Sequence, residues 1–301
     1  LDSLCLSVPV ISTTFASVPR MFASLGKESV GWLLIDEAGQ ALVQHAAGAI
    51  WRAKRTIVVG DPKQLEPVCT VSGVMEDSLA RHFNVASDMW PSQTSAQALA
   101  DRSARVGTWL PDELQDKVWV GCPLRLHRRC DEPMFGISNA IAYGGTMVHG
   151  KKPGDDDLLP PGALLDVRGT KTEGHWIEEE GELLRGLLRQ LLVKGVPSDE
   201  IALISAFRDC ATRLKRIAGA FRLDQKKTGT VHTSQGKEAQ VVVLVLGGNP
   251  NSPGAKAWAA QKPNLLNVAV SRAKSRLYVI GNRQQWERQK HFDVMTRLLV
   301  P

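Results

Sequence analysis

The chain contains 301 residues with a formal net charge of +6, and 43% of its residues are hydrophobic and 23% charged. This length allows a sizeable core and favours two domains over one, and the composition is that of a soluble globular protein. No apolar run approaches the roughly 18 residues that a membrane helix needs, so we expect a cytoplasmic protein without membrane contact. The five scattered cysteines contain no CxxC pair, which excludes a zinc site and indicates reduced thiols. The mild positive charge suits a polyanionic partner without identifying one.

Short apolar runs of strand length recur along the chain. Their lack of alternation is typical of strands that are covered on both faces, as in a parallel sheet. The runs occupy residues 8–13, 32–38, 55–61, 117–122, 200–207, 239–248 and 276–282. Between two of them, the leucines of residues 179–195 form one helical stripe opposite charged residues, and Gly195 suits the C-terminus of that helix. Strands that alternate with such helices predict an α/β fold with right-handed crossovers.

Two stretches interrupt this alternation. Residues 73–115 are polar and poor in strand patterns, so we interpret them as an excursion at a domain boundary. Residues 151–163 are rich in Pro, Gly and Asp and predict a surface loop with three adjacent acids in water.

The polar residues that directly follow the apolar runs are the candidates for chemistry, because ligands of open parallel sheets bind beyond the carboxyl ends of the strands. Asp36 and Glu37 follow the apolar residues 32–35. One carboxylate could hold Mg²⁺ through its water shell while the other accepts a proton from a water that attacks a nucleotide phosphate. An acid pair that caps a helix N-terminus would explain the same residues, so this motif alone leaves both interpretations open.

The segment GDPKQLEP at residues 60–67 follows the next run and is more specific. Gly60 permits a sharp turn, Asp61 suits a turn, and the neutral amide of Gln64 could orient a water or contact a phosphate oxygen. An ordinary turn after a strand explains Gly60 and Asp61 but gives no reason for Gln64.

Together with three other segments, these residues resemble the motor of superfamily 1 helicases, in the branch that contains the RNA helicase of nonsense-mediated decay and its DNA-acting relatives. The five segments occur in the order of the family across nearly the whole chain. They are VISTTFAS (10–17), DEAGQ (36–40), GDPKQLEP (60–67), TVHTSQGKEAQVVVL (230–244) and LLNVAVSRAKSRLYVIGN (265–282). The resemblance implies two RecA-like domains with parallel sheets, the P-loop NTPase fold, and hydrolysis of ATP in the cleft between them.

The resemblance assigns nucleotide chemistry to residues of both domains. Asp36 would hold Mg²⁺, Glu37 would be the catalytic base, and Gln64 would contact the γ-phosphate. The other residues implied at ATP are Gly60 and Asp61 in the coupling motif, Gly236 at a close backbone approach, Glu238 at the ribose and Arg272 as an arginine finger. A planar, permanently charged guanidinium suits the last role, and a surface ion pair is the other explanation for an arginine there.

A single nucleic-acid strand, with movement from 5′ to 3′, is the partner that the resemblance implies. The candidates to grip its phosphates without reading sequence are Thr13 and Thr14 in the first domain and His232, Thr233 and Ser234 in the second. Because recognition of the 2′-hydroxyl depends on local geometry, the sequence leaves DNA and RNA open.

One motif departs from the family pattern LxxQYRMHP. The sequence LRLHRRCDEP at residues 124–133 stands in its place, and aligning the leading Leu puts Arg129 at a second arginine finger. The same alignment replaces Gln by His127, Tyr by Arg128 and Met by Cys130, which leaves the stacking role of that Tyr without an assigned residue.

The chain contains no P-loop of the form GxxxxGK[ST], whose amides and lysine bind the β and γ phosphates. We therefore interpret it as the C-terminal part of a helicase motor, with a partial first domain at 1–115, a complete second domain at 116–301 and a missing N-terminal part of the same protein as partner. We expect the isolated chain to bind ATP weakly and to hydrolyse essentially none.

Two alternatives stay open. The chain could be a nucleic-acid-binding or regulatory module that keeps the motor fold without catalysis, although such a module has no evident use for Glu37 or Arg272. It could also be the ATPase of a defence or repair assembly in which the motor drives an attached nuclease, which would require domains outside this chain.

Overall fold

The computed structural model describes residues 7–112, 116–152 and 159–299. The chain divides into two compact units. The first unit comprises residues 1–108 and 119–123, and the second comprises residues 109–118 and 124–301. The boundary that the sequence predicts, between residues 115 and 116, lies within the stretch 109–118 that belongs to the second unit.

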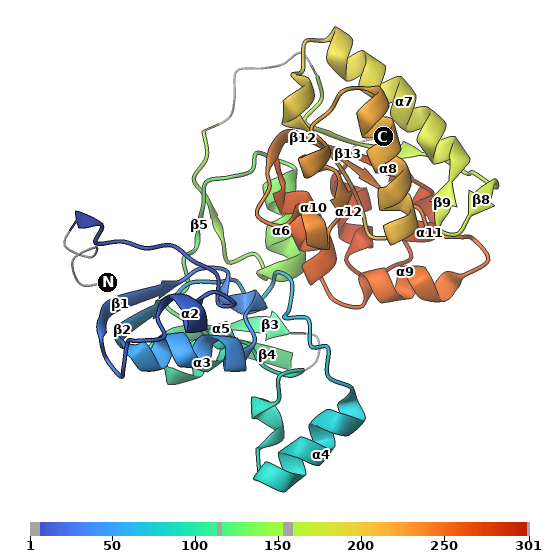
Figure 1. The fold of residues 1–301 in the computed structure, drawn as a ribbon. Coiled ribbons are helices and arrows are strands. Elements are labelled where there is room, and N and C mark those ends of the chain that lie inside the picture. Colours follow the sequence, from blue (N-terminus) through green and yellow to red (C-terminus); the bar gives the residue numbers. More distant parts are fainter. Residues whose placement is uncertain (1–6, 113–115, 153–158, 300–301) are drawn as a thin grey trace. The chain divides into compact units, whose positions relative to one another are not determined.

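The first unit is built on a pair of parallel strands, β1 (Val30–Ile35) and β2 (Ala53–Val58), with Ile35 opposite Val58. The helix α3 (Val43–Arg52) connects them (Figure 1). Its small buried residues let it lie close to the strands, in a core cluster of Ile35, Ala38, Ala41, Ala46 and Ala96. The other elements in this part of the chain are α2 (Val18–Met21), η1 (Ala38–Gln40), α4 (Gly73–Phe83), η2 (Ser87–Met89), α5 (Ala96–Ser103), β3 (Gly107–Asp112) and β4 (Asp116–Gly121).

Two expectations for this unit were wrong. The apolar run at residues 8–13 forms no strand, and Val8 and Val10 are exposed. Pro9 between them has no amide hydrogen to donate to a sheet, which explains the irregular conformation. The runs in β1 and β2 do form strands, but they are not covered on both faces, since Trp32 and Leu34 are 56% and 69% exposed.

The second unit contains a five-stranded parallel sheet in the order β11-β10-β12-β13-β7. The three central strands are almost entirely buried, as their continuous apolarity predicts. The strands of the sheet are β7 (Gly162–Asp166), β10 (Ile201–Ser205), β11 (Gly229–Thr230), β12 (Ala239–Val245) and β13 (Ala273–Gly281). The short pairs beside it are β5 (Leu126–His127) with β6 (Val148–His149), and β8 (Thr172–Glu173) with β9 (Trp176–Ile177).

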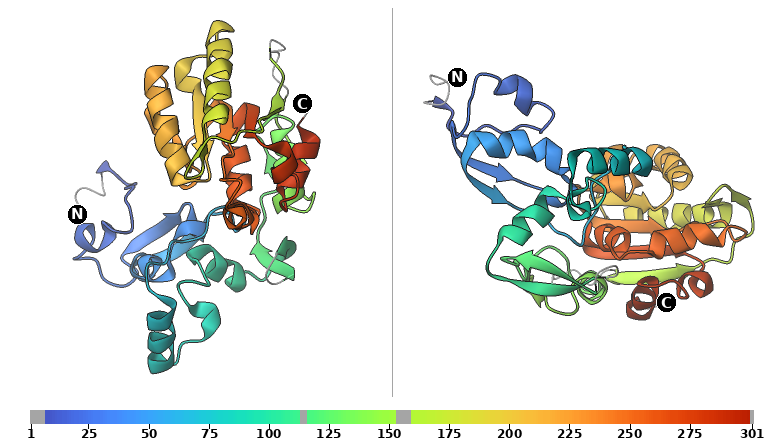
Figure 2. Two further views of the ribbon diagram at one scale, coloured as in Figure 1. Left: turned by 90° about the vertical axis from the view of Figure 1, so that its right-hand side faces the viewer. Right: turned by 90° about the horizontal axis from the view of Figure 1, so that it is seen from below.

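Helices cover both faces of this sheet. One face carries α7 (Glu178–Val193) and α8 (Arg208–Ala220), and the other carries α6 (Met134–Ala142), α10 (Asn264–Ser271) and α12 (Phe292–Leu298) (Figures 1 and 2). The remaining elements are η3 (Ser198–Glu200), η4 (Gln225–Lys227), η5 (His232–Ser234), α9 (Pro253–Ala260) and α11 (Arg283–Trp286). This arrangement confirms the α/β class and the parallel, RecA-like sheet that the sequence predicts.

The predicted helix at residues 179–195 is confirmed as α7. Three glutamates in its first turn face the positive end of the helix dipole, and the buried stripe contains Leu184, Leu188 and Leu191. Gly195 follows the last turn with a φ of 86°, and its amide donates to the carbonyl of Leu192 at 3.0 Å. A glycine is therefore required there by the left-handed backbone.

The predicted loop at residues 151–163 overlaps the start of β7, which the sequence analysis missed. The three adjacent acids of that loop lie outside the described residues. Within the described parts of the chain, no helix is both long and apolar enough to span a bilayer. The described cysteines, Cys69, Cys122, Cys130 and Cys210, are all free thiols.

Candidate nucleotide and nucleic-acid site

Asp36 and Glu37 stand at the carboxyl end of β1, and both are exposed. The amide of Glu37 donates to Asp36 Oδ1 at 2.9 Å, and Gln40 Nε2 donates to Glu37 Oε2 at 3.0 Å. Glu37 adopts a left-handed conformation with φ 54° and ψ 37°, which costs a residue with a side chain roughly 1–2 kcal/mol. The next element, η1, is a single turn of three residues whose cap makes no side-chain hydrogen bond, so helix capping does not explain this acid pair.

Asp61 organises the loop after β2. Its Oδ1 accepts a hydrogen bond from the amide of Lys63 at 2.9 Å, and its Oδ2 accepts one from Gln64 Nε2 at 3.1 Å. Asp61 and Gln64 are both half-buried. The side-chain amide of Gln64 is therefore held by the loop itself, and contact with a phosphate requires its nitrogen to share or leave Asp61.

The loops after β1 and β2 touch through their backbones at two glycines. A Cβ on Gly60 would lie 2.7 Å from the nitrogen of Gly39, and a Cβ on Gly39 would lie 2.8 Å from the carbonyl oxygen of Asp61. Gly60 does not have a positive φ, so the need for a glycine at this position comes from the close approach of the two backbones. A hydrogen bond of 2.9 Å from the amide of Ala38 to the carbonyl of Val59 ties the same two loops.

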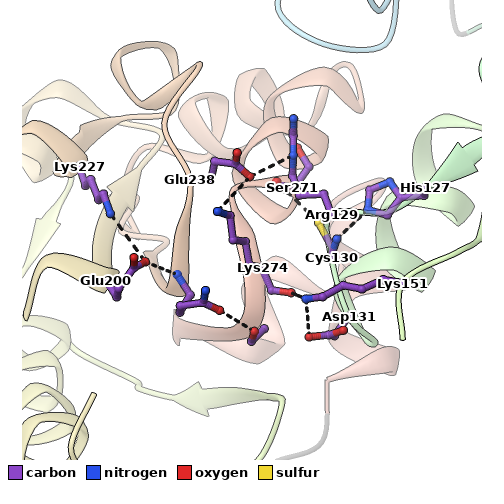
Figure 3. Close-up of polar contacts among 12 residues, drawn as sticks. His127, Arg129, Cys130, Asp131, Lys151, Glu200, Lys227, Glu238, Ser271 and Lys274 are labelled. Carbon is purple, nitrogen blue, oxygen red and sulfur yellow. Dashed lines mark hydrogen bonds and ion pairs between the residues drawn. The ribbon is translucent and has the colours of Figure 1, made fainter. Parts of the chain in front are cut away.

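In the second unit, Glu238 and Arg129 form an ion pair (Figure 3). Arg129 Nε lies 3.2 Å from Glu238 Oε2, and Lys274 Nζ lies 3.9 Å from the same oxygen. All three side chains are between 36% and 41% exposed. Gly236, two residues earlier, has a φ of 72° and open space around the position of a Cβ. The structure thus brings together the residue expected at the ribose and one of the two expected arginine fingers.

Arg272, the other expected arginine finger, is buried. It stands at the C-terminus of α10 and is only 2% exposed, so it is not the surface ion-pair arginine of the alternative interpretation. Its Nε donates to the carbonyl of Val268 at 3.3 Å, and its terminal nitrogen donates to Ser271 Oγ at 3.4 Å. These two bonds use two of the five N–H donors of the guanidinium.

Thr13 and Thr14 lie on the surface in irregular chain just before α2. Thr13 Oγ1 donates to the sulfur of Met21 at 3.2 Å, and Thr14 Oγ1 donates to Ser17 Oγ at 3.4 Å. Both hydroxyls are accessible to a phosphate.

The three strand candidates of the second unit form the single turn η5 after β11. His232 and Thr233 are exposed, whereas Ser234 is buried and its hydroxyl donates to the carbonyl of Val231 at 2.8 Å. Partial burial, followed by the charge of Arg208, lowers the pKa of His232 and favours its neutral form. His232 and Thr233 are therefore better placed than Ser234 to contact a phosphate.

The sequence analysis missed the second basic partner of Glu238 and the bonds that hold it. The carbonyl of Lys274 accepts from the amide of Asp131 at 2.9 Å and from Lys151 Nζ at 2.7 Å, and Lys151 also pairs with Asp131 Oδ2 at 2.7 Å (Figure 3). Lys274 was visible as a basic residue beside Arg272 in the last motif. No sequence pattern marks the pair of Lys151 and Asp131, because they come from separate loops.

The donors present fit a magnesium nucleotide better than a resident metal of another kind. In the described parts of the chain, no group of three or more His, Cys, Asp or Glu side chains could hold a metal ion. Mg²⁺ keeps several waters and takes one or two carboxylates together with phosphate oxygens. The exposed carboxylates of Asp36 and Glu37, at the end of β1, meet that requirement.

Comparisons with known proteins identify the family of the chain. Residues 124–284 match a family model described as an AAA domain, and residues 2–72 match a second model with the same description. The DNA replication ATP-dependent helicase/nuclease DNA2 of Saccharomyces cerevisiae is 23% identical over 293 residues, which cover 92% of this chain and 19% of that protein. The 5'-3' DNA helicase ZGRF1 of Mus musculus is 24% identical over 294 residues, which cover 93% of this chain and 14% of that protein.

Among solved structures, the arterivirus nonstructural protein 10 (helicase) in complex with DNA matches with a TM-score of 0.40 and 15% identity, over 83% of this chain and 39% of that one. The chain spans about a fifth of the length of the DNA2 relatives from the two yeasts.

Proposed function

Because a single AAA domain model covers more than half of it, the chain belongs to the AAA domain family, on the superfamily 1 helicase branch, and we propose that it is the motor region of an ATP-dependent helicase or translocase. The observation that carries the proposal is the exposed pair Asp36 and Glu37 at the end of β1, locked through Gly39 and Gly60 to the loop that holds Gln64. A binding module needs neither the carboxylates nor their strained, hydrogen-bonded placement.

Asp36, Glu37 and Gln64 would act on the nucleotide from the first unit. Bound Mg·ATP supplies the phosphoanhydride bond whose hydrolysis provides the free energy, and Asp36 would hold the metal through its water shell. Glu37 would accept the proton of the attacking water, with the hydrogen bond from Gln40 Nε2 keeping its carboxylate oriented. Gln64 would sense the γ-phosphate by turning its amide away from Asp61.

The second unit would contribute the charge that compensates the transition state. Arg129 and Arg272 would donate to phosphate oxygens, a role in which a planar guanidinium is worth more than an ammonium group. In the structure the guanidinium of Arg129 is paired with the carboxylate of Glu238. If Glu238 turns to accept a hydrogen bond from a ribose hydroxyl, Arg129 loses this partner and becomes available to a phosphate. Binding of the nucleotide would then free the arginine finger from its ion pair.

The nucleic-acid strand would be held by side chains that can donate to phosphates, from the irregular chain before α2 and from the turn η5. The exposed candidates are Thr13, Thr14, His232 and Thr233, and Ser234 is the buried candidate. Such contacts bind without reading sequence. Since the relatives DNA2 and ZGRF1 are named as DNA helicases, single-stranded DNA is the first partner to test, with RNA beside it.

Strand-stimulated hydrolysis by the natural full-length protein that contains these residues tests the proposal. Wild type is compared with Glu37→Gln and with Glu182→Gln, an exposed glutamate of α7 that serves as the matched control. Loss of a general base should lower the turnover number about 10²- to 10⁴-fold, whereas the control should match wild type. A protein that binds strands but never hydrolyses ATP would instead be a binding module, and full turnover by the Glu37→Gln variant would remove the proposed base.

A further inference from the structure

The peptide groups on either side of Cys130 are held by two histidines. The amide nitrogen of Cys130 donates to His127 Nε2 at 3.0 Å (Figure 3), and the carbonyl oxygen of Cys130 lies 3.0 Å from His149 Nε2. The two histidines are register partners in the parallel pair of β5 and β6. An amide nitrogen can only donate and a carbonyl oxygen can only accept, so His127 Nε2 must carry no hydrogen and His149 Nε2 must carry one.

Phe135 of α6 fixes the planes of both imidazole rings. It stacks on His149 with ring centroids 4.6 Å apart and 22° between the planes, and it contacts His127 at 5.4 Å with 46° between the planes. The phenyl ring is 8% exposed. Rings packed in this way cannot rotate freely, so the two nitrogens stay directed at the backbone of Cys130.

Cys130 and Asp131 are also bonded to the last residue of α10 and to the start of β13. The thiol of Cys130, which is fully buried, donates to the carbonyl of Ser271 at 3.6 Å, one residue before Arg272. Next to it, the amide of Asp131 donates to the carbonyl of Lys274 at 2.9 Å. The two residues that follow Arg129 are therefore bonded to residues on both sides of Arg272.

We propose that His127 and His149, in opposite tautomers, are positioning residues that set where the guanidinium of Arg129 lies relative to Arg272. In this role both imidazoles act through the peptide groups that flank Cys130 and need no contact with the nucleotide. The inference rests on the proposed function, because it gives Arg129 the role of an arginine finger. It also assigns a use to the histidine that replaces the glutamine of the family pattern at residue 127.

The charges around His127 keep it in the form that this role requires. Burial, and then the positive charges of Arg129, His149 and Lys151, lower the pKa of His127 below its ordinary value of 6.5. The acids nearby, Asp131 and Glu238, are already paired with Lys151 and Arg129. A neutral His127 can accept a hydrogen bond from the amide of Cys130, whereas a protonated one would point a hydrogen at that amide. The hydrogen bond between His127 and Cys130 should therefore be lost only in acid.

The first experiment reads the tautomers of the wild-type chain, without any substitution. Nitrogen-15 chemical shifts of the imidazoles at pH 7.5 should show His127 with its hydrogen on Nδ1 and His149 with its hydrogen on Nε2. A His127 with a hydrogen on Nε2 would overturn the inference, whatever the activity of any variant.

The second experiment measures steady-state ATP hydrolysis by the full-length protein. His127→Phe keeps the ring against Phe135 but removes the acceptor, and a misplaced finger should lower kcat about 10- to 100-fold with little change in KM. His127→Gln restores an acceptor, so its kcat should lie within about threefold of the wild-type kcat. The kcat of wild type should fall in acid as the imidazole of His127 becomes protonated, and the kcat of His127→Gln should not show this fall. His45→Gln, at an exposed site on α3, is the matched control and should behave as wild type.

Arg129→Ala separates this inference from the proposed function. If ATP hydrolysis is impaired in Arg129→Ala while folded His127→Phe retains the wild-type kcat, the positioning role of His127 is wrong and the arginine-finger role of Arg129 is kept. If Arg129→Ala itself retains wild-type turnover, the finger assignment and the positioning role both fall. If His127→Phe does not fold, the tautomer measurement on the wild-type chain decides.

Discussion

Glu180 of α7 should make the stability of the second unit depend on pH. Its carboxyl group is fully buried, and Oε2 accepts a hydrogen bond from the amide of Gly247 at 2.9 Å. Burial raises the pKa of Glu180 from 4.5 to about 8, and the bond from Gly247 and the charge of Lys256 only partly oppose this. Between these two pH values the folded unit retains a proton that the unfolded chain releases. The free energy of unfolding should therefore fall by about 1.4 kcal/mol for each pH unit, or about 3 kcal/mol between pH 5 and pH 7.

The perturbation that isolates this effect is Glu180→Gln, which keeps an oxygen to accept from Gly247 and does not titrate. Glu182→Gln, exposed on the same helix, is the control. Hydrogen exchange of the amides of β10 and β12 reports the free energy of opening of the second unit separately from the first. From pH 5 to pH 7, the free energy of opening of wild type and of the control should fall by about 3 kcal/mol more than that of Glu180→Gln. Parallel pH dependence in all three proteins would refute the reasoning.

Three further outcomes are expected. Gly60→Ala should destabilise the first unit by about 1–3 kcal/mol in denaturant unfolding, because the new methyl would lie 2.7 Å from the nitrogen of Gly39; an unchanged midpoint would contradict the close approach. Gly236→Ala has space but a φ of 72°, so it should cost only roughly 1–2 kcal/mol in the same measurement, and a larger loss would show an unseen clash. Iodoacetamide should label the exposed Cys122 in the folded protein but Cys130 only after unfolding, because burial raises the pKa of Cys130 to about 12. Peptide mass spectrometry measures the labelling, and rapid labelling of Cys130 in the folded protein would contradict its burial.

The sequence predicted the sheet of the second unit well, because burial on both faces leaves a strong pattern. β10, β12 and β13 read as continuous apolar runs and are buried accordingly. The same pattern predicted β1 and β2 as strands but misjudged their exposure, since apolarity does not show whether another element packs on each face of the sheet. β7 was missed because its five residues follow directly on a stretch dominated by Pro and Gly, which outweighed Leu164 and Leu165.

The candidate site could be predicted only where its residues are close in the sequence or at the ends of neighbouring strands. Asp36 and Gly60 lie at the ends of β1 and β2, so the parallel pattern alone places their loops at one edge. The ion pair of Arg129 with Glu238 joins residues from distant motifs, and no local pattern specifies it. The buried state of Arg272 and the bonds of His127 and His149 to Cys130 likewise depend on packing that only the folded unit supplies.

The contact between Gly39 and Gly60 has a mechanical consequence. Where side chains separate two loops, one loop can shift while rotamers absorb the movement. Here peptide atoms meet directly, and the bond from Ala38 to Val59 adds a second point of attachment. Peptide groups are stiff, so a displacement of a few tenths of an ångström at Glu37 has to move the backbone of Asp61 as well. The two loops are therefore expected to move together, so that a shift of the backbone at Glu37 would also reach the loop that holds Gln64.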